Sequence, residues 1–440
     1  MELIYGIKDK PSFGKVLLFA IQQLLAIMAA TIAVPAIIGH GLTASAALFG
    51  AGVGTVVYLL FTKSASPVFL GSSFAFIGSM LSAFAGAASV QIGYWGLIIG
   101  ALMAGLVYVI IAIIVKFCGV SWIDKLMPPV IIGPTVAIIG LSLAPNAVGD
   151  LMKSTVQGGS PYVALICGLV TLFVTMICST YGKKIGRLIP FILGIIAGYI
   201  LASIFALIGT LKEIPSLIVI NYEAIEKITG FFALPDFTFM LGGSEGLKGI
   251  TGTYLLTIFA AYVPVAFVVF AEHLADHKNL STIVGVNLLE EPGLTRTLLG
   301  DGIGTMVSTV FGGCPNTTYG ESIGCVAITR NASTVSIWGC AALCILFSMI
   351  SPLVAFLETI PNCVMGGVCI ALYGFIAVSG FKMFQTVDLN KNKNLFVASI
   401  IFITGVGGMV VSFGQIQIRT VACALILGIV TNIILSKESD

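Results

Sequence analysis

The sequence predicts an all-α polytopic membrane protein with 14 transmembrane segments in two inverted repeats of seven. Three observations lead to this fold class. Of the 440 residues, 58% are hydrophobic and only 9% are charged, whereas soluble domains average about 25% charged residues. The apolar residues gather in twelve runs, most of them long enough to cross a bilayer. Two further, less apolar segments take matching places in the two halves of the chain.

Each apolar run is expected to form one helix, because a spanning helix needs about 20 apolar residues. The runs of the first half lie at residues 16–38, 43–61, 94–115, 130–148, 162–180 and 188–209. Those of the second half lie at 251–275, 297–312, 334–356, 363–384, 395–413 and 418–435. The first run is too long for the core of a cleavable signal peptide, so we interpret it as a transmembrane helix.

The two exceptional segments, residues 67–86 and 315–330, are rich in Gly, Ser, Thr and Pro. If both cross the membrane as broken spans, each is the third crossing of its own half, and Phe74 and Tyr319 lie 245 positions apart. Because each half then has an odd number of crossings, the halves are inverted relative to each other. Paired interrupted segments indicate a transporter's binding site, since irregular backbone at that depth must line a cavity or be buried in protein.

The distribution of Lys and Arg predicts that both termini are cytoplasmic. With fourteen crossings, 16 of the 21 Lys and Arg residues fall on the inner side, and the other five fall outside: Lys153, Lys212, Lys227, Lys248 and Arg419. This asymmetry obeys the positive-inside rule. It is lost if either broken segment is not counted as a crossing.

Charge and cysteine content exclude several other functions. The net charge of +2 gives no electrostatic basis for a nucleic-acid partner. The ten cysteines lie mostly in apolar runs without a C-x-x-C pair, so we interpret them as small buried hydrophobic residues. The sequence holds no phosphate-binding loop and no H-E-x-x-H zinc helix. We therefore expect no metal and no organic cofactor.

Two carboxylates follow the apolar residues of the run at 251–275. Glu272 and Asp276 are four positions apart, so on a helix they share one face. In one interpretation they mark the cytoplasmic end of the helix, in the headgroup region. In the other, Glu272 lies deeper and faces a cavity, because ionisable groups inside the membrane are costly and usually functional.

Glu321 lies in the second broken segment, which Pro315 opens and Gly320 and Gly324 loosen. A half-helix that starts near Glu321 directs free backbone N–H groups at whatever lies in front of it. Such donors beside a carboxylate suit a small planar ligand with both N–H and C=O groups on its edge. The alternative is that both broken segments are only tight packing turns.

Aromatic residues near these segments are further candidates. Phe74 and Phe76 in the first broken segment could stack on a ligand ring. Tyr373 could do the same, or it could be only an interfacial aromatic residue.

These residues carry a family resemblance. Glu321-Ser322-Ile323-Gly324, followed by Thr329-Arg330, resembles the signature of the nucleobase/ascorbate transporter family, also called nucleobase:cation symporter-2. Together with GSSFAF, FAEH, LYG and EPGLTR, the stretch PNTTYGESIG looks more narrowly like the bacterial uracil permeases. Purine-transporting members tend to carry Gln-Asn where this chain has Glu321-Ser322, which favours a pyrimidine substrate.

The resemblance implies a fold in which segments 3 and 10 are each part strand and part half-helix. A core domain would comprise segments 1–4 (residues 1–118) and 8–11 (residues 245–358), and it would hold the substrate. A gate domain would comprise segments 5–7 (residues 119–244) and 12–14 (residues 359–440). The family often forms homodimers through the gate domain.

The resemblance also implies roles for single residues. Glu272 and Glu321 match the two substrate carboxylates, whereas Phe74 and Gly320 match positions that offer backbone N–H groups. Further substrate-site positions are Ala30 on the first helix, Tyr319, and Tyr373 on the gate side. The coupled proton would involve Glu272 and Asp276.

Two departures from the family pattern affect polar contacts near this site. A Gln-His pair common in the first helix is Gln22-Gln23 here, and Asp276 replaces a His that uracil permeases can carry. His277 is adjacent to Asp276 but would point elsewhere on a helix.

These features lead to a hypothesis of proton-coupled uracil import across a bacterial cytoplasmic membrane. The carboxylates would accept hydrogen bonds from the ring N–H groups, and the backbone N–H groups would bind its carbonyls. A buried carboxylate prefers its neutral form, so protonation from outside would favour loading and the inward movement of the core against the gate, an elevator mechanism. Xanthine, uric acid or thymine is the alternative substrate. A passive channel or a membrane enzyme is a competing class that the residues favour less.

Overall fold

The computed structural model describes the chain except for residues 1–2, 120–121, 123–125, 184, 414–415 and 438–440. Within this part, eight helices are long and apolar enough to cross a membrane. They are α1 (Phe13–Ile38), α2 (Ala44–Phe61), α4 (Val90–Cys118), α6 (Pro129–Leu151), α7 (Pro161–Tyr181), α9 (Pro190–Leu211), α12 (Gly252–Val284) and α17 (Asn362–Phe384). The protein is therefore a mostly helical, multi-pass membrane protein.

Shorter elements fill the rest of the described chain. The helices are α3 (Ile77–Ala85), α8 (Ile185–Leu188), α10 (Glu223–Glu226), α11 (Thr238–Lys248), α13 (Leu294–Gly312), α14 (Gly320–Thr329), α15 (Thr334–Phe347), α16 (Ser351–Glu358), α18 (Asn392–Val406) and α19 (Thr420–Ile434). Single turns form η1 (Phe74–Phe76), η2 (Pro215–Leu217), η3 (Leu289–Gly293) and η4 (Leu435–Lys437). The strands are β1 (Leu70–Ser72), β2 (Asn316–Thr318), β3 (Val411–Phe413) and β4 (Ile416–Ile418).

Local sequence signals set the starts of the long helices. The Thr43 and Ser89 side chains cap α2 and α4 by accepting hydrogen bonds from backbone N–H groups of the first turn. Pro129, Pro161 and Pro190 begin α6, α7 and α9. Proline suits this position because its missing N–H has no intrahelical acceptor there. Most of these helices begin and end within four residues of the predicted runs.

Two predicted runs contain a helix break that the sequence did not predict. The run 334–356 is broken into α15 and α16, because Pro352 in the first turn of α16 cannot continue the ladder of the preceding helix. The run 395–413 ends as a helix at Val406, since Gly407 follows and Gly408 has a φ of +67°. Beyond this point β3 pairs with β4 in an antiparallel hairpin.

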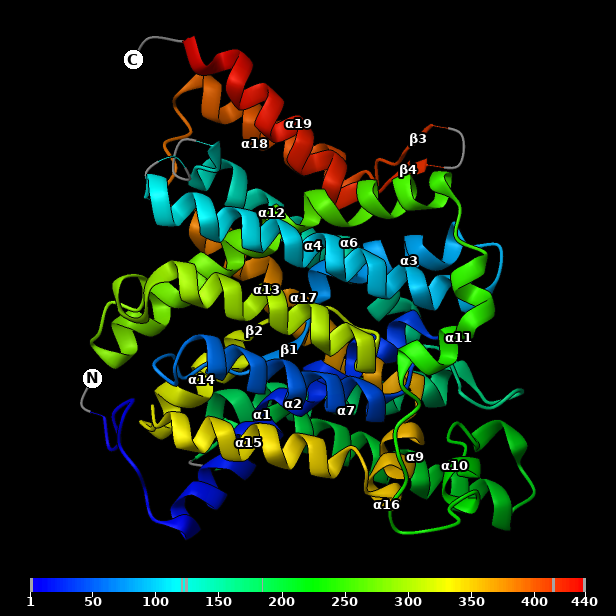
Figure 1. Ribbon diagram of the computed structural model, residues 1–440. Helices are drawn as coiled ribbons and strands as arrows, with labels where there is room; N and C mark the ends of the chain where they lie inside the picture. The colour runs from blue at the N-terminus through cyan, green and yellow to red at the C-terminus, as the bar shows by residue number, and fades with distance from the viewer. Residues whose placement is uncertain (1–2, 120–121, 123–125, 184, 414–415, 438–440) are drawn as a thin grey trace.

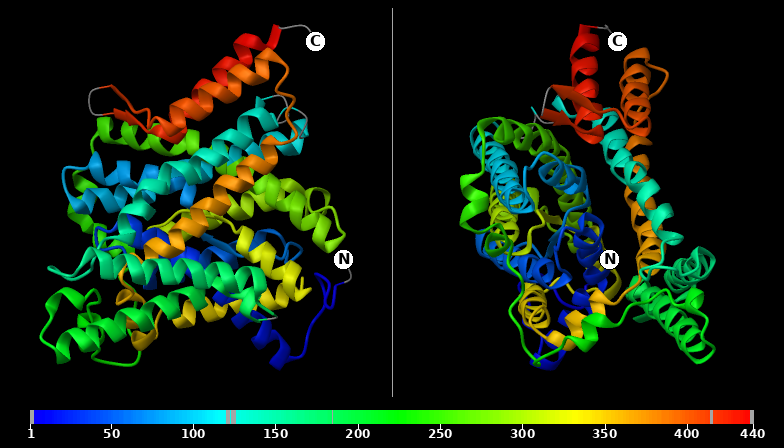
Figure 2. Two further views of the ribbon diagram at one scale, coloured as in Figure 1. Left: turned by 180° about the vertical axis from the view of Figure 1, so that it is seen from behind. Right: turned by 90° about the vertical axis from the view of Figure 1, so that its right-hand side faces the viewer.

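The helices form two groups that lie side by side (Figure 2). The first group packs α1, α2, α4, α12, α13 and α15 around the broken segments. The second group packs α6, α7, α9, α17, α18 and α19 together as a thinner layer. In Figure 1 the long helices run across the view, and both ends of the described chain lie toward its left edge.

The two broken segments meet in the middle of the molecule (Figure 1). The first is β1 followed by η1 and α3, and the second is β2 followed by α14. The strands pair antiparallel, with Leu70 opposite Thr318 and Ser72 opposite Asn316. The prediction that each broken segment is part strand and part helix is confirmed.

A close approach between the strands requires glycine at position 71. A Cβ atom on Gly71 would lie 2.4 Å from the Tyr319 ring, which no real contact allows. The Tyr319 hydroxyl donates a hydrogen bond of 2.7 Å to the Ser72 carbonyl oxygen. The Tyr319 side chain therefore packs against β1 and holds the start of α14 beside it.

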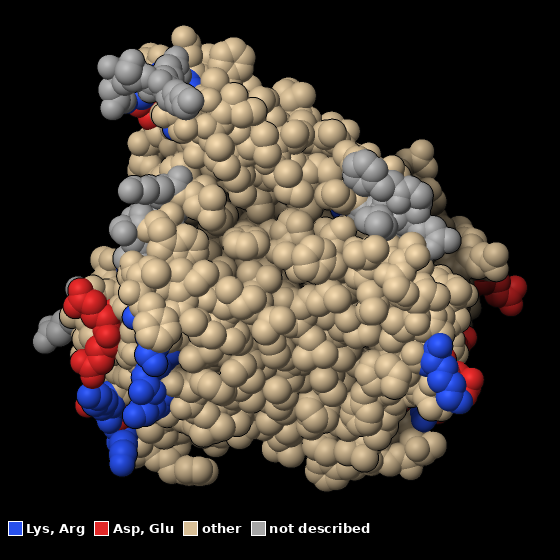
Figure 3. Space-filling view, turned by 45° about the horizontal axis from the view of Figure 1, so that its top comes forward, with Lys and Arg blue, Asp and Glu red and all other residues tan. Residues whose placement is uncertain are grey.

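The surface agrees with a membrane environment. Figure 3 shows a broad face without Lys, Arg, Asp or Glu, and the charged side chains gather toward its edges. A wide uncharged face suits contact with lipid, where a charged side chain costs several kcal/mol.

Candidate functional site

A cavity of about 320 Å³ lies between the two helix groups, beside the broken segments. The first group contributes three carboxylates to its wall, those of Glu272 and Asp276 on α12 and Glu321 on α14. The second group contributes mainly apolar side chains: Val136, Phe191, Phe375, Ile376 and Met383. One wall is therefore polar and acidic, and the other is apolar and aromatic.

A smaller space of about 50 Å³ adjoins this cavity and shares Glu272, Gly320 and Glu321 with it. Phe74 and Tyr319, from the two broken segments, also line the smaller space. Two carboxylates, two helix starts and two aromatic residues therefore line one small space beside the β1–β2 pair.

Helix α12 extends nine residues past the predicted end at residue 275, to Val284. Glu272 and Asp276 thus lie within the helix, and both line the larger cavity. This geometry agrees with the deeper interpretation of Glu272 rather than the headgroup interpretation. Sequence alone left the two open, because the Glu272–Lys278 stretch looks like a polar helix end.

The adjoining face of α12 carries two histidines that are fully buried, His273 and His277. The His273 Nδ1 atom lies 2.6 Å from the Asp301 Oδ2 atom on α13, and its Nε2 atom lies 3.0 Å from the Thr297 hydroxyl. The His277 Nε2 atom lies 2.7 Å from the Tyr58 hydroxyl on α2. These contacts fix the rotation of α12, so that its carboxylates face the cavity. The prediction that His277 points away from Asp276 is confirmed.

Asp276 links α12 to the second broken segment. The Thr318 hydroxyl, at the end of β2, donates a hydrogen bond of 2.6 Å to the Asp276 Oδ2 atom. This donor was not among the predicted site residues. The sequence signal was present in NTTYGESIG, where a hydroxyl residue precedes the Tyr319-Gly320 turn, but nothing in the sequence showed its partner.

Two helix starts line the smaller space. Phe74 is the first residue of η1, and Gly320 is the first residue of α14. The first N–H groups of a helix have no intrahelical acceptor, and they favour an anionic or carbonyl oxygen in front of them. Glu321 lies in the first turn of α14. The site therefore offers backbone donors and carboxylate acceptors side by side.

Neither Tyr373 nor Ala30 is among the residues that line these two cavities. The Tyr373 ring packs edge-on against the Phe74 ring, with 5.7 Å between centroids. Its contact therefore joins α17 of the second group to η1 of the first. Ala30 is buried in α1 and does not line either cavity. Its role in the site stays a prediction.

Gln23, which stands where the family commonly has a His, has a hydrogen-bond partner in α14. The Gln23 Nε2 atom donates a hydrogen bond of 2.5 Å to the Ser322 Oγ atom, and this oxygen also accepts a bond of 3.1 Å from the Phe69 N–H. Both side chains are buried. Ser322 thus faces α1 rather than the cavity, and it joins α1, β1 and α14.

The apolar wall was missed at the sequence level. Phe191, Phe375 and Met383 lie within apolar runs whose other members face lipid or neighbouring helices. Nothing in their spacing distinguishes them from packing residues. Only the juxtaposition of the two groups shows which of these side chains meet the carboxylates.

Among the residues that the structure describes, no group of three or more His, Cys, Asp or Glu side chains could hold a metal ion. The arrangement can instead bind a planar polar molecule and exchange protons with it or with water.

Known proteins match nearly the whole chain. A family model described as "Permease family" matches residues 14–413. A uracil permease of Bacillus caldolyticus is 38% identical over 435 residues, which cover 98% of this chain and 94% of the relative. A uracil permease of Bacillus subtilis is 36% identical, with 99% and 96% covered. These relatives are permeases rather than enzymes.

Among solved structures, the transmembrane domain of the cyanobacterial bicarbonate transporter BicA aligns with a TM-score of 0.63. The alignment covers 97% of this chain and 100% of that domain at 17% identity. At this identity the likeness shows a shared fold alone.

Proposed function

This chain belongs to the permease family, the nucleobase/ascorbate transporters that its motifs resemble, and we propose that it is a proton-coupled symporter that imports uracil. The observation that carries the proposal is the meeting of Glu272 and Glu321 in one cavity with the start of α14. The uracil permeases that match over nearly its full length support the choice of substrate.

Uracil complements the polar groups of this site. Its ring carries two N–H donors and two carbonyl acceptors. Glu272 and Glu321 accept from the N–H groups, and the backbone N–H groups of Phe74 and Gly320 donate to the carbonyl oxygens. A hydrogen bond to the ionised Glu321 carboxylate contributes about 1.5–3 kcal/mol, and one to the carbonyl oxygen of protonated Glu272 contributes about 0.5–1.5 kcal/mol. The Phe74 and Tyr319 rings limit the ligand to a flat shape.

Proton coupling follows from the cost of a carboxylate inside the membrane. An ionised group facing a small cavity is far from bulk water, so the neutral form is favoured. Glu272 takes up the proton when the site faces outward, and the protonated site loads uracil and moves inward. Asp276, one turn further along α12, passes the proton toward the cytoplasm. A proton that crosses 100 mV contributes about 2.3 kcal/mol, enough for roughly fifty-fold accumulation.

Alternating access uses the two helix groups as two domains. The core comprises residues 1–118 and 245–358, and the gate comprises residues 119–244 and 359–440. The chain crosses the membrane fourteen times, and both termini lie in the cytoplasm. The two ends of the described chain lie toward the same side of Figure 1, which agrees with an even number of crossings. The core slides against the gate in an elevator movement. The gate domains of two protomers contact each other and form a homodimer in the bacterial cytoplasmic membrane.

The conformation described here is inward-facing in this topology. The larger cavity reaches Phe191 at the start of α9 and Met383 at the end of α17. Both of these helix ends lie on the side assigned to the cytoplasm. The Phe74–Tyr373 contact lies at the opposite end of the site, where it separates the carboxylates from the outside.

Uptake of radiolabelled uracil into proteoliposomes tests the proposal. We expect accumulation when the outside is made acidic, its collapse on addition of a protonophore, and weaker competition by xanthine than by unlabelled uracil. Competition by xanthine or thymine that exceeds competition by uracil would identify another nucleobase as the substrate. Uptake that never exceeds equilibration would instead indicate a channel.

A further inference from the structure

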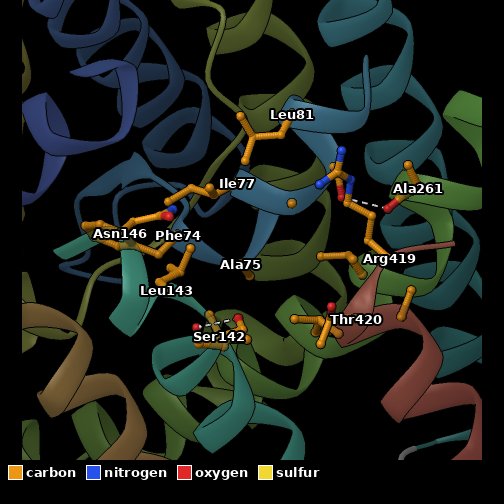
Figure 4. Close-up of a pocket in the computed structure, with 16 residues that line it drawn as sticks. Phe74, Ala75, Ile77, Leu81, Ser142, Leu143, Asn146, Ala261, Arg419 and Thr420 are labelled. Atoms are coloured by element: carbon orange, nitrogen blue, oxygen red, sulfur yellow. Dashed lines mark hydrogen bonds between the residues drawn. The ribbon is translucent and has the colours of Figure 1, made fainter. Parts of the chain in front are cut away.

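A second cavity, of about 230 Å³, lies against Phe74 (Figure 4), and the three carboxylates do not line it. Phe74 and Ala75 line both this cavity and the small space beside Glu272 and Glu321. The remaining walls come from α3 and α12 of the first helix group and from α6 and α19 of the second. Since a water in the liquid takes about 30 Å³, the cavity has room for roughly seven waters or a single small ring.

Arg419, immediately before α19, is the cationic residue of this cavity. Its Nε atom donates a hydrogen bond of 2.6 Å to the Ser82 Oγ atom on α3. Among the residues whose side chains the structure describes, the Arg419 side chain has no other hydrogen-bond partner, and none of their carboxylates lies within ion-pair distance. The terminal nitrogens of the guanidinium thus have no acceptor from the described protein, although the residue is half-buried.

An arginine in this state is costly. A guanidinium stays charged in proteins. A partly desolvated charge without a counter-charge is unfavourable unless hydrogen bonds compensate it. The guanidinium presents a planar fork of donors that matches a carboxylate or a pair of carbonyl acceptors. The free donors of Arg419 are therefore suited to a ligand with acceptor oxygens.

The other walls restrict the shape of such a ligand. Figure 4 shows Arg419 and Thr420 on one side of the cavity and Phe74, Leu143 and Asn146 on the other. The Phe74 and Leu143 side chains are apolar, whereas the exposed Asn146 amide can both donate and accept. A flat ring with acceptor oxygens at one edge and an N–H group at another fits these walls.

We propose that this cavity is a second binding station, in which Arg419 holds the carbonyl or carboxylate edge of a pyrimidine ring. In the topology given above it lies on the outer side of Phe74, so a ligand here waits on the path to the carboxylate site. The inference rests on the proposed function for its substrate class. It differs from that function in one property: the outer station is cationic, whereas the inner site is acidic.

This difference in charge separates the two sites experimentally. Orotate is a uracil ring that carries a carboxylate. It suits the guanidinium of Arg419, whereas Glu272, Asp276 and Glu321 repel it from the inner site. Orotate is therefore a probe for the outer station alone, and uracil is a probe for both.

A purely structural role for Arg419 makes a different prediction. The Arg419–Ser82 hydrogen bond joins the two helix groups, so it could act only as a latch between them. Ser82→Ala breaks this bond but keeps the guanidinium, and Arg419→Gln removes both. If Arg419 is only a latch, the two variants behave alike. If it binds the ligand, only Arg419→Gln loses the station.

The test is equilibrium binding of radiolabelled orotate to the purified full-length protein. We expect wild type and Ser82→Ala to bind it, Arg419→Gln to bind it about tenfold or more weakly, and Glu321→Ala to bind it at least as well as wild type. No orotate binding by wild type, equal binding by Arg419→Gln, or loss in Glu321→Ala would overturn the proposal. Arg419-dependent orotate binding without uracil uptake would overturn the proposed function but not the station.

Discussion

The first broken segment, β1–η1–α3, and the second, β2–α14, are built alike but carry different side chains. Both begin with a three-residue strand, the strands pair with each other, and both continue as a helix that starts at the same small cavity. The second places the Glu321 carboxylate in its first turn, whereas the first places the Phe74 ring there and no charge. The repeated backbone supplies donors from both sides, and the charge comes from one side only.

This difference separates the hydrogen-bond donors, which depend on the fold, from the acceptors, which depend on single residues. Backbone N–H groups at Phe74 and Gly320 follow from strand–helix geometry, so many sequences could provide them. The acceptors Glu272 and Glu321 are single side chains with no counterpart in the first segment. We therefore expect substitutions of the carboxylates to have larger effects than substitutions that only disturb the paired backbone.

The largest effect is expected from Glu272→Gln, which keeps the shape of the side chain but cannot ionise. Proton-driven accumulation should fall from roughly fifty-fold to none, while exchange of internal for external uracil persists at saturating concentrations. Uptake and counterflow in proteoliposomes measure the two. Glu245→Gln is the matched control, because Glu245 is an exposed carboxylate paired with Lys248. Accumulation that survives in Glu272→Gln would remove this residue from the coupling step.

The pairing of the two segments is tested by Gly71→Ala. The added Cβ atom meets the Tyr319 ring at 2.4 Å, so the ring or the strand must move. Overpacking of this kind costs about 1–3 kcal/mol, and we expect uptake to fall about tenfold and the Tm to drop. Gly324→Ala is the control, because a Cβ atom there meets nothing within 4 Å. If both variants behave as wild type, the close approach is not needed for the site.

The link between α12 and β2 is tested by Thr318→Val. The variant keeps the β-branched shape in the strand but removes the donor to Asp276. Loss of a hydrogen bond to a carboxylate costs about 1.5 kcal/mol, or roughly tenfold. We expect this loss in the maximal rate of proton-driven uptake, with the affinity for uracil little changed. A change confined to affinity would place Thr318 in the binding step instead.

The smallest effect is expected from Phe74→Leu. Leucine keeps the backbone donor and most of the apolar bulk, but it loses the edge contact with Tyr373. Aromatic pairs of this kind contribute about 0.5–1.5 kcal/mol, so the KM for uracil should rise by about twofold to tenfold. Phe231→Leu, at an exposed phenylalanine, controls for the substitution type. An effect larger than that of Glu272→Gln would reverse the comparison between backbone and carboxylate.

Much of the fold was predictable because apolar run length reports directly on membrane crossing. The strand–helix form of the broken segments also followed from the family motifs around Glu321 and Phe74. The breaks at Pro352 and Gly407 were missed, since apolar content continues through both positions although the helix ladder does not. A single proline or glycine changes the average hydrophobicity of a run very little, so the pattern does not show the break.

The site was predictable in part. Glu272, Asp276 and Glu321 are charged residues in an apolar chain, so their charge drew attention to them, whereas Gly320 came from the family resemblance; all four line one cavity. Phe191, Phe375 and Arg419 were not predicted as site residues. Their positions depend on how the second helix group packs against the first, which is a long-range property that periodicity does not encode.

The most direct test of the central claim is the affinity of the purified protein for radiolabelled uracil after Glu321→Ala. We expect binding to weaken by about thirty-fold or more, because a carboxylate acceptor from the second broken segment is lost without replacement in the first. Glu245→Gln should bind as wild type does. Wild-type affinity in Glu321→Ala would contradict the assignment of the paired segments as the uracil site.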